Sequence, residues 1–499
     1  METNALIDLV HEAQGQLWVD KVNETHRTGH GLQRQCGVDG SLPSGGMISD
    51  DYTDEKVAQE VAALSLIHDT IVGAVPKIHA WGPAASNRLG LGPFIMMDFI
   101  DGVSASDVLK DPHAEQPTRL MRDDISDREV EFIYRQLAKF QLQLFALDFD
   151  RIGSLPSPTA EPQSPATTRP LTLKAHSILQ NGGVDTFGVP SDFSFSLLVL
   201  ARDRSQGFAT TTEYFQYLVD QDWKQLVHQP NSIYGPHNAK KKYLAFKVLR
   251  SLIPDLIHPK YDGCKFKLIC DDLGLANLIF RSREDLTVVG IVDLEWSYSG
   301  PAQLFGSAPW WLLQDRPVNC AWDCKGDEPP KIAARYFRYL EIFIRVLEEE
   351  EAKLPGQSER ELSSLVKWSQ ASGAMWLHML LSSGFNDHHS FPFTMLRRHL
   401  GTAEWARREK AFENADELDA FAARKVGEME KYEEALEKRE KELALVDSGK
   451  LTREEFVAHA LTEPGWPLGP SSFRINDEGR DDEASGLPQM LASSSVHAD

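Results

Sequence analysis

The feature that most constrains the fold is the stretch KLICDDLGLANLIF, at positions 267–280 of this 499-residue chain. Its apolar start is interrupted by two aspartates and a glycine, and the sequence becomes apolar again after Asn277. A second apolar run, LTVVGIVD at 286–293, follows a short polar turn, and the two runs together predict a β-hairpin. Taken alone, the polar insert is typical of an ordinary turn, because Asp, Gly and Asn are favoured in turns.

The predicted hairpin would bring three polar side chains together. The residue that enters the first strand of a hairpin and the residue that leaves the second lie side by side. We therefore expect Asn277 to neighbour Asp293, with Asp272 approaching from the preceding loop. Mg²⁺ takes oxygen ligands, and a carboxylate that does not bind the metal can orient a hydroxyl and accept its proton. The spacing predicts a phosphoryl-transfer site, and Asp271, one position out of register, is expected to face solvent.

The remaining apolar patterns predict an α+β protein with two lobes. The first lobe combines a helix over 53–68 with strand-like runs at 75–81 and 92–102, and the second run is apolar enough to be buried. A larger helical body follows and contains the hairpin. Its predicted helices cover 129–147, 210–257, 328–352, 359–383 and 403–445, and Thr452 with Glu455 forms a capping box for one more helix.

These patterns also predict the division of the chain. Residues 1–102 are expected to hold an N-terminal helix and a small nucleotide lobe with incomplete phosphate-binding strands. Residues 103–400 are expected to form the helical lobe, and 401–465 the charged C-terminal helices. Residues 466–499 are rich in Ser, Gly, Asp and Glu, which bury too little apolar surface to fold. The Pro-, Ser- and Thr-rich segment 154–170 is expected to be a loop.

Composition argues against several classes of function. The formal net charge of −22 argues against nucleic acid as a partner, because that binding depends on Lys and Arg. No apolar run approaches the ~20 residues of a membrane span, and residues 1–15 lack the pattern of a signal peptide. The five cysteines have no disulfide spacing, and the lone pair Cys320 and Cys324 is a weak zinc candidate. A reduced, cytoplasmic protein is expected.

Six motifs resemble the aminoglycoside phosphotransferase / choline kinase-like family, most closely its large fungal branch. In chain order they are EVAAL, VPKIHAW, PFIMMDFIDG, FDRIGSL, CDDLGLAN and IVDLEW, all within residues 50–400. The resemblance implies a protein-kinase-like pair of lobes with ATP and Mg²⁺ bound between them. By this resemblance Asp272 matches the catalytic base, and Asn277 and Asp293 match the two metal ligands. Glu60 matches the glutamate that orients the nucleotide lysine. Asp98 and Ile100 lie in the segment that matches the adenine-binding linker.

Two positions depart from the family pattern. Cys270 stands where the family has a histidine that supports the catalytic loop, and a thiol hydrogen-bonds only weakly. A lysine of the small lobe should precede Glu60, yet the chain has none between Lys21 and Lys56. The loss of one such preorganised contact typically costs ~10²–10³ in rate.

Two functions therefore remain open. The first is an ATP- and Mg²⁺-dependent kinase of a small molecule with a hydroxyl group, whose identity the sequence does not define. The second is a catalytically inactive kinase-fold protein that binds a protein partner, for instance through the C-terminal helices. The missing lysine has three explanations: an inactive protein, a kinase that uses another cation, or a sequence that lacks a coding segment near residue 40.

Three further features each allow two interpretations. His388 and His389 could bind a metal, but adjacent loop residues point apart, which favours a polar turn. Trp310 and Trp311 could cap a substrate cleft or pack in the core. The charged helix over 403–445 could bind a partner or simply present solvated Glu–Lys pairs.

Overall fold

The computed structural model describes most of the chain between residues 50 and 459. The described residues are 50–71, 75–87, 92–112, 120–156, 168–180, 207–263, 265–319, 322–324, 328–354, 360–452, 455, 456 and 459. The expected N-terminal helix, the glycine-containing stretch before residue 50, most of the loop 154–170, and the tail 466–499 lie outside them. The described part is a mixed, mostly helical fold with three small sheets. None of its helices is both long and apolar enough to cross a bilayer.

The first part of the fold is a helix on a two-stranded ribbon. Helix α2 (Asp50–Thr70) contacts strands β1 (Ile78–Gly82) and β2 (Phe94–Met97), which pair antiparallel. Val57 and Val61 of α2 form a separate apolar cluster with Ile95 of β2. The prediction that the second run is buried was wrong for most of the strand. Only Ile95 of β2 is fully buried, because alternate strand residues point away from α2.

The predicted hairpin is present and joins the first part of the fold to the helical body. Strand β5 (Leu278–Phe280) pairs antiparallel with β6 (Val288–Ile291), and Leu278 lies opposite Ile291. A short strand after the linker, β3 (Val103–Ser104), adds to the other edge of β5. A separate pair, β4 (Lys267–Cys270) with β7 (Ser297–Gly300), flanks the hairpin in sequence. The turn between β4 and β5 and the turn between β6 and β7 therefore carry the predicted site.

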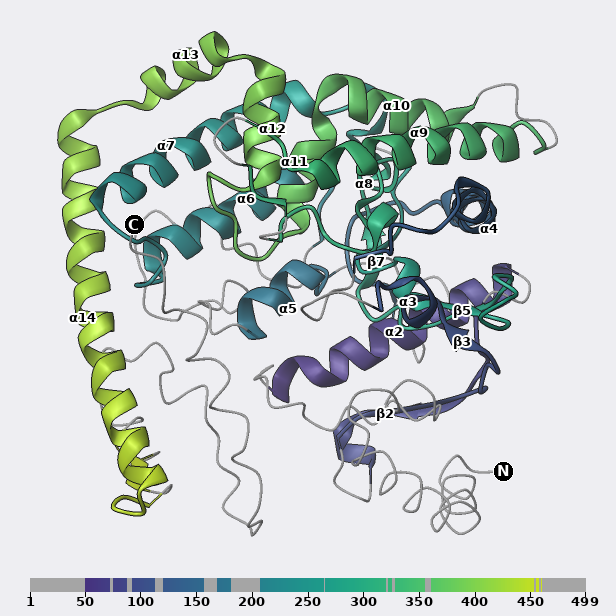
Figure 1. Ribbon diagram of the computed structural model, residues 1–499, viewed down its shortest axis with the longest axis horizontal. Coiled ribbons are helices and arrows are strands. Elements are labelled where there is room, and N and C mark those ends of the chain that lie inside the picture. The colour runs from purple at the N-terminus through teal and green to yellow at the C-terminus, as the bar shows by residue number, and fades with distance from the viewer. Residues whose placement is uncertain are drawn as a thin grey trace.

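The helical body lies to one side of these strands in Figure 1. Two pairs of helices contact each other along their lengths: α4 (Asp127–Phe145) with α9 (Lys331–Glu351), and α6 (Thr211–His228) with α7 (Pro236–Leu252). Helix α4 begins with a full capping box between Ser126 and Glu129. The other described α-helices before residue 401 are α3 (Ala105–Leu109), α5 (Leu173–Gln180), α8 (Ala302–Phe305), α10 (Glu361–Ser372), α11 (Ala374–Ser382) and α12 (Phe391–Leu400).

Two helices that the sequence predicted as continuous are broken. The predicted helix 359–383 is divided into α10 and α11 by Gly373, whose φ of 78° lies in the left-handed region. The predicted helix 403–445 is divided into α13 (Thr402–Phe412) and α14 (Ala415–Asp447). The side chain of Asn414 caps α14 by accepting the backbone N–H of Glu417 at 3.3 Å. Both breaks use residues whose local preference is to end or begin a helix.

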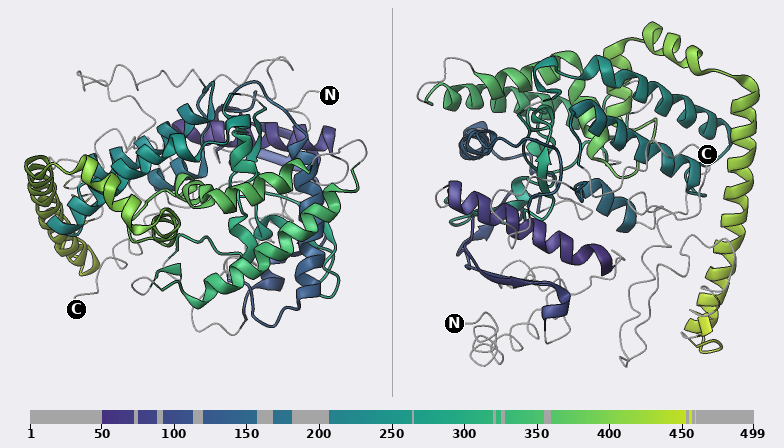
Figure 2. Two further views of the ribbon diagram at one scale, coloured as in Figure 1. Left: turned by 90° about the horizontal axis from the view of Figure 1, so that it is seen from above. Right: turned by 180° about the vertical axis from the view of Figure 1, so that it is seen from behind.

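The C-terminal helices pack on the helical body and then extend beyond it. Helices α13 and α14 both contact α7, and Phe421 of α14 stacks against Trp223 and meets Tyr243 edge to face. Figures 1 and 2 show α14 along one edge of the molecule, with its later turns beyond the end of α7. The predicted capping box of Thr452 with Glu455 is present, since Glu455 N–H donates to the Thr452 hydroxyl at 3.2 Å. The first turns of α14 pack against α7, and it is these turns that contribute buried side chains to the core.

Candidate functional site

Asn277 lies in a tight turn between β4 and β5 and contacts the loop after β6. The turn ends in the short 3₁₀ segment Leu275–Asn277, and Gly274 N–H donates to Asn277 Oδ1 at 2.8 Å. The Asn277 side-chain amide in turn donates to the backbone oxygen of Asp293 at 3.1 Å. The structure therefore places Asn277 beside Asp293, through the hairpin geometry that the sequence suggested.

Asp293 has an unusual backbone conformation. Its φ of 63° lies in the left-handed region, which few residues other than Gly, Asn and Asp adopt. Residues held in such conformations concentrate at functional sites, where the surrounding structure enforces the strain. Here the Asn277 contact and the closing strand pair of the hairpin enforce it. The residue as a whole is only partly buried.

Asp272 forms an ion pair that the sequence did not predict. Arg316 Nη2 donates to Asp272 Oδ1 at 2.9 Å and to the backbone oxygen of Asp271 at 3.1 Å. The side chains of Asp272 and Arg316 are 38% and 21% exposed, so the pair lies at the surface of the site rather than inside the core. No motif signals Arg316, because it follows Asp272 by many residues and lies in a loop without a characteristic pattern.

Asp271 does not face solvent, and that prediction was wrong. Asp272 pairs with Arg316, whereas Asp271 lines an internal cavity beside Tyr298. Burial raises the pKa of Asp271 to about 6, although nearby Arg316 and hydrogen bonds with Leu173 and Tyr298 oppose that rise. Leu173 is the first residue of helix α5, so its backbone hydrogen bond to the Asp271 carboxylate ties the turn after β4 to the start of that helix.

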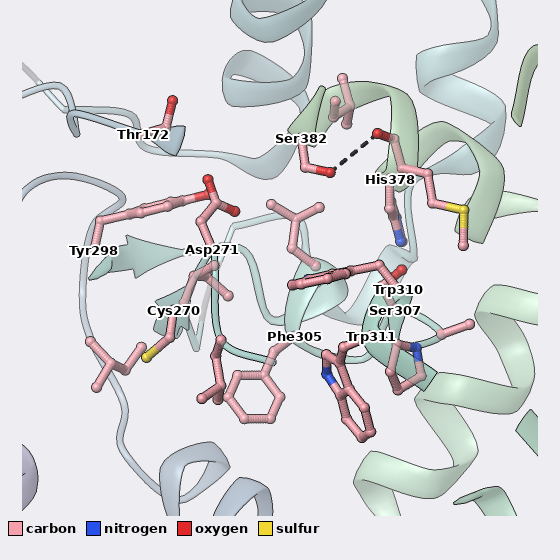
Figure 3. Close-up of a pocket in the computed structure, with 18 of the residues that line it drawn as sticks. Thr172, Cys270, Asp271, Tyr298, Phe305, Ser307, Trp310, Trp311, His378 and Ser382 are labelled. Carbon is pink, nitrogen blue, oxygen red and sulfur yellow. Dashed lines mark hydrogen bonds between the residues drawn. The ribbon is translucent and has the colours of Figure 1, made fainter. Parts of the chain in front are cut away.

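A cavity of about 120 Å³ lies beside Asp271. Figure 3 shows Asp271 and Tyr298 on one side of it and His378 and Ser382 of α11 on the other, with the ring of Trp310 between them. Most of the other lining residues are apolar, among them Leu144, Leu218, Leu268, Leu273, Phe305, Trp311 and Met379. The two neighbouring tryptophans, Trp310 and Trp311, differ in burial. Trp311 is buried in the core, whereas Trp310 is partly exposed and lines both the cavity and the loop that holds Arg316.

His378 makes the stability of this region depend on pH. Its ring is buried, Nε2 lies 2.9 Å from Gln303 Nε2, and burial lowers its pKa to about 3. The unfolded chain, with a histidine pKa near 6.5, takes up a proton that the folded protein excludes. The contribution of this group is therefore complete above about pH 6.5 and is lost as the pH falls toward 3.

We expect His378→Leu to remove this pH-dependent contribution to the free energy of unfolding. Between pH 7 and pH 4, the unaltered protein should lose about 3 kcal/mol more free energy of unfolding than the variant, because one pKa unit is worth about 1.4 kcal/mol. Denaturant titrations at the two pH values measure the difference. Equal pH dependence in the two proteins would show that His378 is not held neutral by burial.

Glu60 is buried on α2, one turn after a lysine at the site. Lys56 Nζ lies 2.6 Å from Glu295 Oε2 and 5.3 Å from the centre of the Trp296 ring. Glu295 follows Asp293 by two residues, so the ion pair ties α2 to the loop that carries the candidate metal ligand. Residues i and i+4 share a helix face, which places Lys56 and Glu60 on the same side of α2. The chain thus has a cation near this loop, although it comes from α2 and not from a preceding strand.

The predicted linker contacts the same hairpin. Asp98 N–H donates to the backbone oxygen of Lys77, and the carboxylate of Asp98 lies 2.5 Å from His79 Nε2. The hydrogen bond with His79 lowers the pKa of the exposed Asp98 carboxyl. Ile100 packs on Gly290 of β6, where an added Cβ would lie 2.3 Å from Ile100 Cδ1. The predicted linker and the hairpin of β5 and β6 are therefore neighbours in the fold.

Cys270 ends β4 and has the character of a neutral thiol. Burial raises its pKa to about 12, although Ser297 hydrogen-bonds to it. A protonated thiol is a weak hydrogen-bond donor, so it supports the loop less firmly than an imidazole would. Of the other cysteine candidates, Cys324 is partly buried and Cys320 lies outside the described residues.

His388 and His389 do not point apart, so the reason given for that expectation was wrong. Their ring centres are 3.8 Å apart, and with Asp387 they offer three ligand atoms within 4.8 Å of one another. Lys242, however, pairs with Asp387 at 2.8 Å. An ammonium group in this position competes with a metal for the carboxylate, which agrees with the polar-turn interpretation.

Comparisons with known proteins return partial matches. No protein-family model matches the chain. A segment is 32% identical over 108 residues to "Altered inheritance of mitochondria protein 9, mitochondrial" of Clavispora lusitaniae, and it covers 21% of this chain and 16% of that protein. The comparison with solved structures also returns a crystal structure of a protein from Ralstonia eutropha that is provisionally assigned as an aminoglycoside phosphotransferase. That match has a TM-score of 0.31 at 13% identity and covers 71% of this chain and 83% of the other.

Proposed function

We propose that this protein is an ATP- and Mg²⁺-dependent phosphotransferase that acts on a hydroxyl group of a small molecule. The observation that carries the proposal is the contact between Asn277 and Asp293 across the hairpin, with Asp272 in the turn just before it. This set of side chains at this spacing is the arrangement that phosphoryl-transfer enzymes use.

In this proposal Asp272 is the general base. The acceptor hydroxyl hydrogen-bonds to the Asp272 carboxylate, which takes its proton as the oxygen bonds to the γ-phosphorus of ATP. The bond from that phosphorus to the bridging oxygen breaks, and ADP leaves with the electron pair. Because Asp272 is partly exposed, its carboxylate is open to a hydroxyl compound from the solvent side.

The residues present fit a magnesium ion. Asn277 Oδ1 accepts one hydrogen bond, from Gly274, and an amide oxygen has a second lone pair for a ligand. Asp293, a residue that is only partly buried, adds a carboxylate, and Mg²⁺ characteristically binds one or two such groups together with phosphate oxygens and water. When bound, the ion would neutralise charge on the β- and γ-phosphates. Asn277 and Asp293 would hold it, and the left-handed backbone of Asp293 would orient its carboxylate.

The two-lobed organisation belongs to the same proposal. Residues up to 102 would form the nucleotide lobe, with the linker at Asp98 and Ile100 against the adenine and Glu60 beside the phosphates. Residues 103–400 would form the lobe that holds the acceptor. The contacts of Ile100 with Gly290 and of Lys56 with Glu295 support this arrangement, since both connect the first segment to the hairpin.

A titration with MgATP tests the proposed function directly. A ligand at 100 times its Kd raises the free energy of unfolding by about 2.7 kcal/mol, which appears as an increase in Tm. We expect this increase with MgATP, and a smaller one with ATP in the presence of EDTA. Asp293→Asn, which suits the left-handed backbone, should reduce the magnesium-dependent part. An unchanged Tm at millimolar MgATP would exclude the kinase function.

A second candidate is an inactive kinase-fold protein that binds a partner, for example through α13 and α14. Two observations favour it: the thiol of Cys270 in place of an imidazole, and the pairing of the Asp272 carboxylate with Arg316. The MgATP titration separates the two candidates, because the inactive protein has no need to bind a nucleotide.

A further inference from the structure

Arg316 is a cation held at the proposed catalytic base. It donates twice through Nη2, to the Asp272 carboxylate and to the backbone oxygen of Asp271. The guanidinium group also lies over the ring of Trp310, with 4.0 Å between Cζ and the ring centre. Its position is thus fixed from two directions, by the catalytic turn and by an aromatic face.

The loop that carries Arg316 is also fixed. It begins at Gln314, which is buried and has a left-handed φ of 61°. The side chain of the next residue, Asp315, accepts hydrogen bonds from Asn319 Nδ2 at 2.5 Å and from Trp322 Nε1 at 2.8 Å. The backbone N–H of Asn319 donates to the oxygen of Arg316 at 3.0 Å. Little reorganisation is needed for Arg316 to act where it stands.

The N–H groups of Arg316 that are not used in these contacts indicate that it binds an anionic ligand. A guanidinium has five N–H groups, and those on Nε and Nη1 make no hydrogen bond to the described residues. A hydroxyl activated by Asp272 lies about 2.6–3.2 Å from its carboxylate, and the phosphorus it attacks lies about 3–3.5 Å further on. Since Nη2 lies 2.9 Å from the same carboxylate, the guanidinium group and the attacked phosphorus would both lie within about 7 Å of that carboxylate. The planar fork of arginine matches that group well.

The chain also needs such a cation. The lysine expected before Glu60 is absent between Lys21 and Lys56, and Lys56 pairs with Glu295. From these observations we infer that Arg316 binds the oxygens of the phosphoryl group during its transfer and supplies, from the acceptor side, positive charge that the missing lysine would otherwise provide. This inference rests on the proposed phosphotransferase function and adds a residue to it.

The test compares the affinity of the full chain for MgADP with and without aluminium fluoride, which imitates the phosphoryl group in transfer. The proteins are the unaltered chain, Arg316→Met, Arg316→Lys and the control Arg281→Met. Arg281 forms a similar arginine–aspartate pair with Asp285, at 2.6 Å, in the exposed turn of the same hairpin. Transition-state analogues bind about 10²-fold or more tightly than ground-state ligands.

We expect aluminium fluoride to tighten MgADP binding to the unaltered protein and to Arg281→Met equally. Arg316→Met should keep its affinity for MgADP alone but lose the tightening, and Arg316→Lys should keep part of it. Slow ATP hydrolysis should fall about 10²–10³-fold in Arg316→Met, with KM for MgATP unchanged.

Three results would overturn the inference. One is that aluminium fluoride still tightens MgADP binding fully in Arg316→Met. The substitution would then change only the pH profile of hydrolysis, through the lost contact with Asp272. The second is an equal loss of affinity with and without aluminium fluoride. The third is a wild-type chain that binds MgADP without any tightening. If the unaltered chain does not bind MgADP at all, the proposed function fails with the inference, and the two failures are thereby distinguished.

Discussion

Asp272→Asn is expected to lower turnover about 10²–10⁴-fold if Asp272 is the proposed base, because that is the usual contribution of a positioned base. Asparagine has nearly the same shape as aspartate and keeps an oxygen that can accept the 2.9 Å hydrogen bond from Arg316. The variant therefore removes the proton acceptor while the turn and its arginine stay in place. Release of ADP from MgATP, with water or a hydroxyl compound as the acceptor, measures the effect, and KM for MgATP should change little.

Asp271→Asn is the matched control for this prediction. It changes the adjacent residue in the same way, but Asp271 faces the cavity and the start of α5. Its effect on turnover should be less than about tenfold, since it does not contact the acceptor in the proposed mechanism. A larger loss in Asp271→Asn than in Asp272→Asn would mean that the catalytic register is shifted by one residue.

Asp222→Ala is expected to cause the largest loss of stability, about 3–5 kcal/mol. Lys174 Nζ lies 2.8 Å from Asp222 Oδ1, and both side chains are only 1% exposed. Asn386 Nδ2 donates to the same oxygen at 3.1 Å. Removal of the carboxylate leaves the Lys174 ammonium buried, with only the backbone oxygen of Leu380 at 3.5 Å as an acceptor. Unfolding in urea, followed by tryptophan fluorescence, measures the loss.

Two comparisons make the stability prediction specific. Glu437→Ala breaks the exposed pair with Lys441 and should leave the free energy of unfolding nearly unchanged. The double variant Lys174→Met with Asp222→Leu replaces the buried pair by apolar side chains and should recover much of the stability lost in Asp222→Ala. If the double variant were less stable than either single variant, the buried pair would not be the cause.

The parts of the site that lie close together in sequence could be predicted. The hairpin follows from two apolar runs around a polar turn, and its geometry alone places Asn277 beside Asp293. The side to which each turn residue points could not be predicted, because it depends on what packs behind the turn. Asp271 is directed inward by Tyr298 and by the first N–H of α5, both of which are contributed by distant segments.

The position of Arg316 could not be predicted from the sequence either. Its position depends on a stacking contact with Trp310 and on a left-handed turn at Gln314. Neither leaves a spacing pattern in the sequence. The helix breaks were also missed, since the apolar periodicity continues through Gly373 and across Asn414 while the backbone does not. Glycine in the first case and an N-capping asparagine in the second are the local signals that could have marked them.

Gly274 carries a consequence for how this site can diverge. A Cβ there would lie 2.9 Å from the Trp310 ring and 3.1 Å from Trp311 Cβ, so any larger residue displaces the wall on which Arg316 rests. Change at position 274 and change at position 310 are therefore coupled. Substitution of Gly274 by a larger residue therefore requires a smaller side chain in place of Trp310. Arg316 then loses the aromatic ring on which it rests.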